Sequence, residues 1–207
     1  MFQNREEAAK ELAQKLLPYR GSEDTVIIAL PRGGVPLAAV VAKELQLPFD
    51  IFFVKKIPSP YNKEAGIGAV SENGYYFVNK TAVESLHIPQ EYIEKEIAAI
   101  QKKMVQKRAL YKKSRNPIKG KRVILIDDGI ATGSSMLLAA QALQKEGAKE
   151  IIIAAPVIPF DTLDSLQAVA NSVVTLQTPK NFMAVGAFYK DFHQLSDDEV
   201  MALLSEV

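Results

Sequence analysis

The chain has 207 residues, 48% of them hydrophobic, and 25 basic against 24 acidic side chains give a net charge of +1. It can therefore bury a full core, and we expect a single domain over residues 1–207 without the dominant charge of a nucleic-acid-binding protein. The absence of cysteine excludes disulfides and thiol catalysis, and two histidines are too few for a His-rich zinc site.

The first half of the chain alternates helix and strand patterns. We predict an amphipathic helix over 6–17, a buried strand over 25–30, a helix over 35–45 and a second strand over 49–54. Turn-forming residues over 56–66 predict a flexible loop. Asn73-Gly74 then predicts a β-hairpin between the apolar stretches 67–70 and 75–78.

The second half continues the alternation. A long helix is predicted from Pro89 to about Lys113, and its basic end is interpreted as a solvated helix face because no aromatic residues interleave with the lysines. Apolar runs at 123–126, 151–155 and 173–176 predict buried strands, with helices after residue 135 and over 162–170. The pattern predicts an α/β fold, a doubly wound central parallel sheet with flanking helices.

Two acids follow the strand at 123–126. Asp127 and Asp128 stand at its carboxyl end, and small residues lead through Gly133 into the next helix. Free amides at a helix start favour a phosphate, while the carboxylates suit sugar hydroxyls or a hard cation. The combination predicts a ribose phosphate site, although acids of this kind also simply cap turns.

A second glycine loop follows the strand at 25–30. Gly33 and Gly34 allow a ligand to approach the backbone closely, and the guanidinium of Arg32 suits diphosphate oxygens. Taken alone, Pro31-Arg32-Gly33-Gly34 could equally be an ordinary strand-to-helix turn.

Together these stretches resemble type I phosphoribosyltransferases, whose signature binds phosphoribosyl pyrophosphate (PRPP). The resemblance implies that Asp127 and Asp128 bind the ribose hydroxyls and that Thr132 and the loop amides bind the 5-phosphate. Gly129 departs from the family, which usually has an apolar residue there. The implied catalytic residues are Arg32, Lys56, Asp127 and Asp128. The implied PRPP-binding residues are Pro31, Arg32, Gly33, Gly34, Lys56, Asp127, Asp128, Gly129, Ile130, Ala131, Thr132, Gly133, Ser134 and Ser135.

The resemblance also implies two features of the diphosphate end. The family's diphosphate loop often has a cis peptide, here expected between Pro31 and Arg32. The loop at 56–66 matches the family's lid over PRPP, which would bring Lys56, and less securely Lys55, to the diphosphate, with Tyr61 and Lys63 arriving on closure. The alternative is an ordinary solvated surface loop.

The aromatic C-terminal segment, about 177–207, resembles the hood that covers the acceptor in this family. Acceptor-binding candidates are Phe182, Met183, Phe188 and Tyr189, although a small satellite core or a dimer contact explains these residues equally well. Mg²⁺ is expected as a cofactor held mainly by PRPP, without an assigned side-chain ligand. Asp191 is a possible metal ligand.

The resemblance thus implies Mg²⁺-dependent transfer of ribose 5-phosphate from PRPP to a nitrogen acceptor. Ala131 stands where transferases for 6-oxopurines have Asp, and residues 155–159 lack their Lys, so a 6-oxopurine is not supported. The alternatives are a catalytically silent PRPP- or nucleotide-binding regulator and a hydrolase of the same fold. We expect a cytoplasmic protein that binds neither nucleic acid nor membrane, and for which a homodimer is possible.

Overall fold

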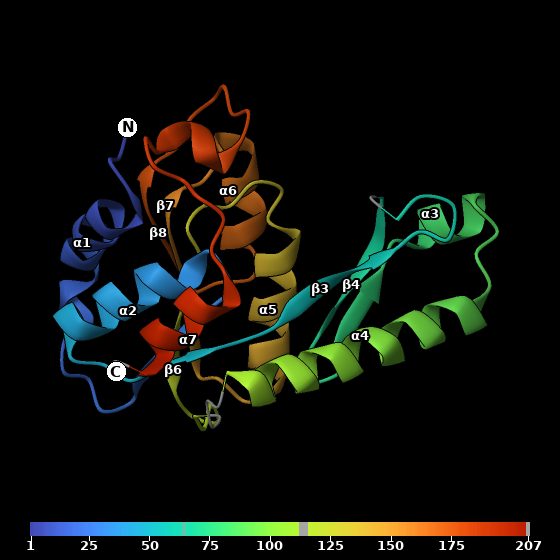
Figure 1. Cartoon of the computed structure of the whole chain (residues 1–207), viewed down its shortest axis with the longest axis horizontal. Helices are drawn as coiled ribbons and strands as arrows, with labels where there is room; N and C mark the ends of the chain where they lie inside the picture. The colour runs from blue at the N-terminus through green and yellow to red at the C-terminus, as the bar shows by residue number, and fades with distance from the viewer. Residues whose placement is uncertain (64, 112–115, 206–207) are drawn as a thin grey trace.

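The central sheet has five strands, all parallel, in the order β2-β1-β6-β7-β8. The computed structural model describes residues 1–63, 65–111 and 116–205 (Figure 1). The strands are β1 (Thr25–Ala29), β2 (Phe49–Ile51), β6 (Arg122–Ile126), β7 (Glu150–Val157) and β8 (Ser172–Gln177).

Helices cover both faces of this sheet. Because side chains alternate along a strand, Ile27 and Ile124 pack with α1 (Arg5–Leu16), α2 (Gly34–Leu45) and α7 (Asp197–Ser205) in one apolar cluster. Val26 and Val123 face the other side, in a cluster with α5 (Ser134–Lys145) and α6 (Phe160–Gln167). The predicted doubly wound α/β fold is confirmed.

Strands β1 and β6 mark the point where the sheet reverses its winding. The chain leaves β1 toward α2 on one face and leaves β6 toward α5 on the other. Ala29 pairs with Ile126, so the two strands end level with each other. In open α/β sheets, ligands bind in the crevice at such a switch point.

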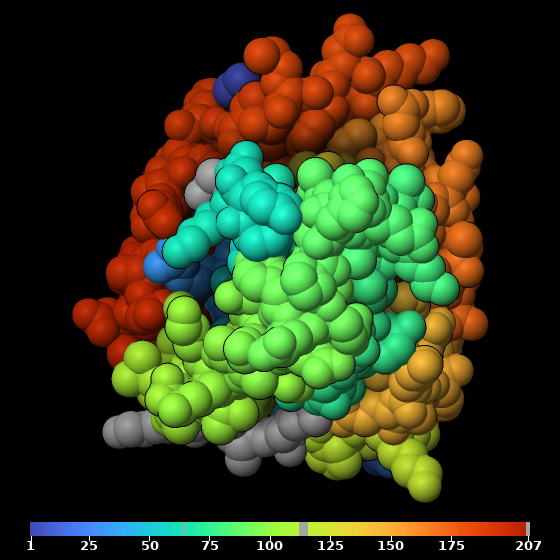
Figure 2. Space-filling view, turned by 90° about the vertical axis from the view of Figure 1, so that its right-hand side faces the viewer, coloured from blue at the N-terminus to red at the C-terminus, as the bar shows by residue number. Residues whose placement is uncertain are grey.

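A second, antiparallel sheet contains β3 (Val54–Pro58), β4 (Gly66–Ser71) and β5 (Tyr76–Val78). With α3 (Lys80–Ser85) and α4 (Gln90–Leu110) it forms an arm, residues 54–110, that projects from the central sheet (Figure 1). Figure 2 looks at the tip of this arm, with the β3–β4 hairpin and α4 facing the viewer.

Two predicted boundaries near the arm are wrong. The predicted strand at 49–54 leaves the central sheet after Phe52, whose N–H donates to the Ala29 carbonyl (2.9 Å), whereas the Phe53 N–H donates to Glu72 Oε2 (3.2 Å). The predicted loop at 56–66 is also shorter, because residues 56–58 pair with β4 as part of β3. Ile57 is fully buried there, which a solvated loop would not allow.

The remaining predicted elements are present, with shifted ends. The hairpin forms with its turn at Gly74, and α4 begins directly after Pro89, whereas its predicted end near Lys113 lies outside the described residues. The short helix α3, capped by the Asn79 side chain on the Ala82 N–H (3.0 Å), was not predicted. In the described parts of the chain, no helix has the length and apolar content needed to cross a membrane.

Arg108 anchors the arm to the sheet edge. Its guanidinium contacts Asp50 Oδ1 (3.1 Å) and Glu72 Oε1 (2.8 Å) and also donates to the Ile51 carbonyl. Asp50 is fully buried, so this contact compensates a carboxylate removed from water. The orientation of α4 is therefore tied to β2 and β4.

We predict that Arg108→Gln lowers the free energy of unfolding by on the order of 3 kcal/mol, because the buried Asp50 carboxylate loses its guanidinium partner. Urea denaturation measures this change, with Lys102→Gln on the exposed side of the same helix as the control. A loss no larger than that of the control would contradict the anchoring role.

Candidate ligand-binding site

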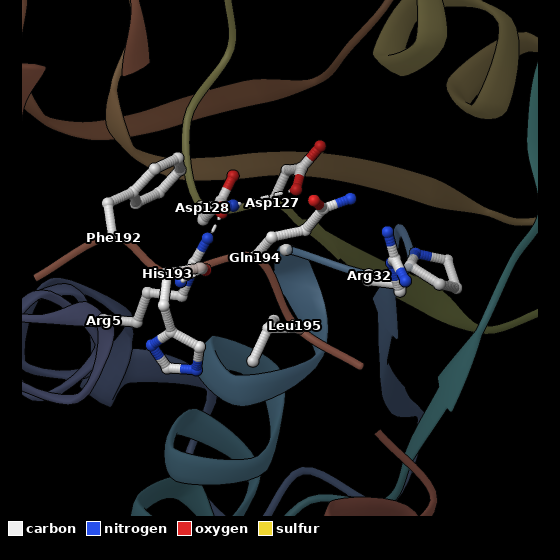
Figure 3. A pocket seen from close by; sticks show the side chains of 10 residues that line it. Arg5, Arg32, Asp127, Asp128, Phe192, His193, Gln194 and Leu195 are labelled. Atoms are coloured by element: carbon white, nitrogen blue, oxygen red, sulfur yellow. Dashed lines mark hydrogen bonds and ion pairs between the residues drawn. The ribbon is translucent and has the colours of Figure 1, made fainter. Parts of the chain in front are cut away.

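Two cavities meet at the switch point, and Asp127 lines both. The larger has a volume of about 380 Å³ and lies between the loop after β1 and the acids after β6 (Figure 3). The smaller, about 180 Å³, is lined by Asp127 and residues 129–136. The larger cavity is lined by Arg5, Pro31, Arg32, Gly33, Asp127, Asp128, Phe192, His193, Gln194 and Leu195.

The smaller cavity lies at the start of α5. Gly133 has a left-handed φ of +78° and precedes Ser134, the first residue of α5. The Ala131 carbonyl accepts a hydrogen bond from Thr162 Oγ1 (2.8 Å), which holds the loop against α6. Because the first amides of a helix lack partners within it, this loop is suited to a phosphate, as the sequence predicted.

The loop after β1 approaches the acids closely. The peptide bond between Pro31 and Arg32 is cis, which confirms the expectation from the family resemblance. A Cβ atom on Gly33 would lie only 2.3 Å from Asp128 Oδ2. Glycine is therefore required at this position for the two loops to come together.

The two acids differ in their partners. Asp127 Oδ1 accepts a hydrogen bond from the Asp128 N–H (2.9 Å). Asp128 Oδ2 forms a buried ion pair with Arg5 Nε (2.8 Å), and its carbonyl accepts from the Tyr189 hydroxyl (2.5 Å). Asp128 is thus fixed by the protein, while the Asp127 side chain lines both cavities.

Arg5 was missed by the sequence analysis. It comes from the first turn of α1, donates to the His193 carbonyl (3.0 Å) and lies 3.9 Å from the centroid of the Phe192 ring. It therefore links Asp128 to the C-terminal segment (Figure 3). No local sequence pattern indicates a pair separated by 123 positions.

Burial controls the acid–base behaviour of the two acids. The pKa of Asp127 is raised well above its ordinary value by burial and then by the negative charge of Asp128. Burial also raises the pKa of Asp128, although the hydrogen bond and charge of Arg5 oppose this effect. The ionised form of each acid is therefore costly in the folded protein. Hydrogen bonds or positive charge from a ligand would stabilise that form.

The Arg32 side chain lies across the larger cavity from Asp128 (Figure 3). Its Nη1 is 3.9 Å from Oδ1 of Asp197 at the start of α7, and the same oxygen contacts Lys107 Nζ (3.0 Å) and the Tyr111 hydroxyl (2.8 Å). These contacts, chiefly the Lys107 hydrogen bond, lower the pKa of Asp197. An anionic ligand of Arg32 would therefore compete with Asp197.

The structure does not bring the predicted lid lysines into this site. Lys55 and Lys56 belong to β3, and with Lys63 they line a separate groove against α4. The expectation that Lys56 contacts PRPP therefore has no support from the described geometry. Tyr61 lies in the connection after β3 and is largely exposed.

The predicted acceptor residues also lie outside both cavities. Tyr189 is buried between Phe2 and Phe192, Phe182 stacks on Phe188 at 5.9 Å, and Met183 is 93% exposed. These aromatic residues mainly build the satellite core that the sequence analysis kept as an alternative. Phe192, His193, Gln194 and Leu195 reach the cavity instead.

This satellite core explains the departure at Gly129. The 3₁₀ turn η2 (Val185–Phe188) places Val185 directly over the loop, and a Cβ atom on Gly129 would lie 2.4 Å from Val185 Cγ1. Glycine at this position therefore makes room for the C-terminal segment.

No protein-only metal centre is evident at the site. Within the described residues, no group of three or more His, Cys, Asp or Glu side chains could hold a metal ion. Asp191 accepts a hydrogen bond from the His193 N–H (3.3 Å) and lines neither cavity, so its role as a metal ligand stays a prediction. The His193 ring points away from the two acids (Figure 3).

Comparison with known sequences identifies relatives of this chain. The sequence model of the phosphoribosyl transferase domain family matches residues 2–193. A Mycobacterium tuberculosis protein, provisionally named a phosphoribosyl transferase, is 37% identical over 210 residues, which cover 99% of this chain and 46% of the relative. The chain thus spans about half the length of these curated relatives.

Solved structures show the same fold. The protein TT1426 from Thermus thermophilus superposes with a TM-score of 0.83 at 37% identity, covering 99% of this chain and 98% of that one. A purine phosphoribosyltransferase from Pyrococcus horikoshii gives a TM-score of 0.51 at 20% identity, covering 93% and 92%. The second likeness concerns the fold alone.

We predict opposite effects on stability for the two neighbouring acids. Asp127→Asn should leave Tm equal to or above the wild-type value at pH 7, because the raised pKa makes ionised Asp127 costly in the folded state. That difference should shrink toward pH 4, where protonation of the wild-type carboxyl removes the cost of its burial. Asp128→Asn should cost on the order of 3 kcal/mol, because Arg5 remains buried without its ion-pair partner.

Thermal denaturation of the two variants between pH 4 and pH 8 measures these effects. Equal losses of stability at pH 7 would contradict the assignment of different roles to the two acids.

Proposed function

Since the chain belongs to the phosphoribosyl transferase domain family, we propose that it transfers ribose 5-phosphate from PRPP to a nitrogen acceptor and releases diphosphate. In this reaction the bond between the ribose anomeric carbon and the diphosphate oxygen breaks, and the diphosphate leaves with the electron pair. A bond from the acceptor nitrogen to the same carbon forms, and the acceptor loses a proton. Because the chain spans about half of its curated relatives, the activity of the whole protein is part of this proposal.

The proposal rests mainly on Asp127, whose side chain lines both cavities. A phosphate at the start of α5 and a diphosphate at Arg32 would lie on opposite sides of this carboxylate. PRPP has that order of groups, with the ribose between its 5-phosphate and its diphosphate. The Asp127 carboxylate is then placed to accept hydrogen bonds from the ribose hydroxyls.

The larger cavity contains groups suited to the leaving diphosphate. Departure of the diphosphate leaves positive, oxocarbenium-like character on the ribose, so catalysis requires stabilisation of the developing negative charge. Arg32 provides a guanidinium, and the loop Pro31–Gly34 brings backbone close to the ligand. No side chain is required as a nucleophile.

Mg²⁺ fits this site as a cation carried mainly by PRPP. The described residues contain no cluster for a protein-bound ion, whereas the Asp127 and Asp128 carboxylates are the hard oxygen ligands that Mg²⁺ accepts. When bound, the ion would neutralise diphosphate charge.

The C-terminal segment is the proposed acceptor side of the cavity. The Gln194 amide points toward Asp127 (Figure 3), whereas the Phe192 ring is already packed against the Arg5 guanidinium and the Tyr189 ring. An amide both donates and accepts hydrogen bonds, which suits a nitrogen heterocycle.

The direct test is diphosphate release from PRPP and Mg²⁺ with a panel of purines, pyrimidines and other nitrogen heterocycles. We expect release that depends on one acceptor. Release without any acceptor would indicate a hydrolase, and PRPP binding without release would indicate a regulatory protein.

We further predict that Arg32→Ala weakens PRPP binding by about 10- to 100-fold, the loss expected for charge-assisted hydrogen bonds. Binding of ribose 5-phosphate should change far less, because it lacks the diphosphate. Isothermal titration calorimetry measures both ligands, with the exposed Arg20→Ala as the control. Equal weakening of both ligands would contradict the role of Arg32.

A further inference from the structure

A groove separate from the site described above lies between β3 and α4 of the arm. It has a volume of about 460 Å³, within the usual range for a small-molecule site, and shares no lining residue with either cavity at the switch point. Its described lining consists of Phe53, Lys55, Lys56, Pro58, Lys63, Tyr92, Glu96, Ala99, Ile100, Lys103, Met104 and Lys107.

One face of α4 forms a wall of the groove and changes character along its length. Tyr92, Glu96, Ile100, Lys103 and Lys107 recur every three or four residues, so they project from the same side of the helix. The end nearer the tip of the arm has an aromatic ring and a carboxylate. The end nearer the central sheet has two ammonium groups.

Strand β3 forms the opposite wall and runs in the direction opposite to α4. Its end, at Pro58, therefore lies beside Tyr92, and its start lies nearer Lys107. The Tyr92 hydroxyl donates to the Pro58 carbonyl (3.1 Å), which joins the two walls at the tip end. At the other end, burial lowers the pKa of Lys55, and the positive charges of Lys107 and Arg32 lower it further. Lysines from both walls therefore converge near the central sheet.

Much of this positive charge has no counterion within the described structure. Lys107 pairs with Asp197 (3.0 Å), but no ion pair between described residues involves Lys55, Lys63 or Lys103. Glu96 is the one acidic residue in the described lining. Clustered ammonium groups repel one another, and a bound polyanion relieves that repulsion.

We propose that the β3–α4 groove binds a nucleoside polyphosphate. The phosphates lie at the end formed by Lys55, Lys103 and Lys107, since lysine ammonium groups are common phosphate ligands. The base lies toward Tyr92, whose ring offers a stacking surface, and the Glu96 carboxylate accepts a hydrogen bond from a base amino group.

The proposal is independent of PRPP transfer, because the groove is formed by different residues. The phosphate end of the groove nevertheless adjoins the loop that contains Arg32. Asp197 contacts Lys107 of the groove (3.0 Å) and also Arg32 (3.9 Å). A nucleotide in the groove is therefore positioned to affect the Arg32 side of the PRPP cavity.

The test is calorimetric titration of the protein with ATP, GTP and inorganic triphosphate at physiological ionic strength. Lys103→Glu should weaken the binding of the preferred nucleotide at least tenfold, because it reverses a charge at the phosphate end. Lys102→Glu is the matched control: it makes the same charge change one position away, outside the groove lining. It should leave the affinity nearly unchanged, since exposed charges are screened over roughly 8 Å at this ionic strength. Asp127→Asn should also retain nucleotide binding.

Several results would overturn the proposal. Equal weakening by Lys102→Glu and Lys103→Glu would mean diffuse charge attraction. Inorganic triphosphate binding as tightly as the nucleotides would mean that the base is not recognised. Displacement of the nucleotide by PRPP, together with loss of binding in Asp127→Asn, would place it in the switch-point cavity instead. A loss of PRPP transfer alone would leave the groove proposal intact.

Discussion

The approach of Gly33 to the Asp128 carboxylate is the contact on which the site depends. The two loops come from neighbouring parallel strands that end level with each other, but only a residue without a side chain allows the loop after β1 to reach the acids. Arg5 also fixes Asp128, through a buried ion pair. As a result, Asp127 stands between a cavity suited to a diphosphate and one suited to a phosphate.

The C-terminal segment joins this site to the rest of the molecule. Val185 packs over Gly129, the backbone at His193 accepts from Arg5, and Asp197 contacts both Arg32 and Lys107. Figure 2 shows a recess between the arm and this C-terminal segment. Arg108 holds the arm at the sheet edge, and Asp197 links Lys107 of the groove to Arg32 of the larger cavity.

The features that the sequence predicted correctly are local. The acids, the two glycine loops and the helices that follow them are each encoded by contiguous residues, and parallel strands necessarily bring their carboxyl ends to one edge. What could not be predicted depends on distant partners. Arg5 pairs with a residue 123 positions away, and the predicted strand at 49–54 carries no local sign of the change of sheet at Phe53, which involves Glu72. For the C-terminal aromatic residues, composition could not separate rings that line a cavity from rings that pack on one another, and the structure packs most of them into the satellite core.

The central claim is that PRPP spans both switch-point cavities with its ribose beside Asp127. A crystal structure of the protein with PRPP and Mg²⁺ tests it most directly. The account predicts the 5-phosphate at the start of α5, within residues 129–136, and the diphosphate at Arg32 and Gly33. PRPP bound in the reverse orientation, or bound only in the β3–α4 groove, would contradict it.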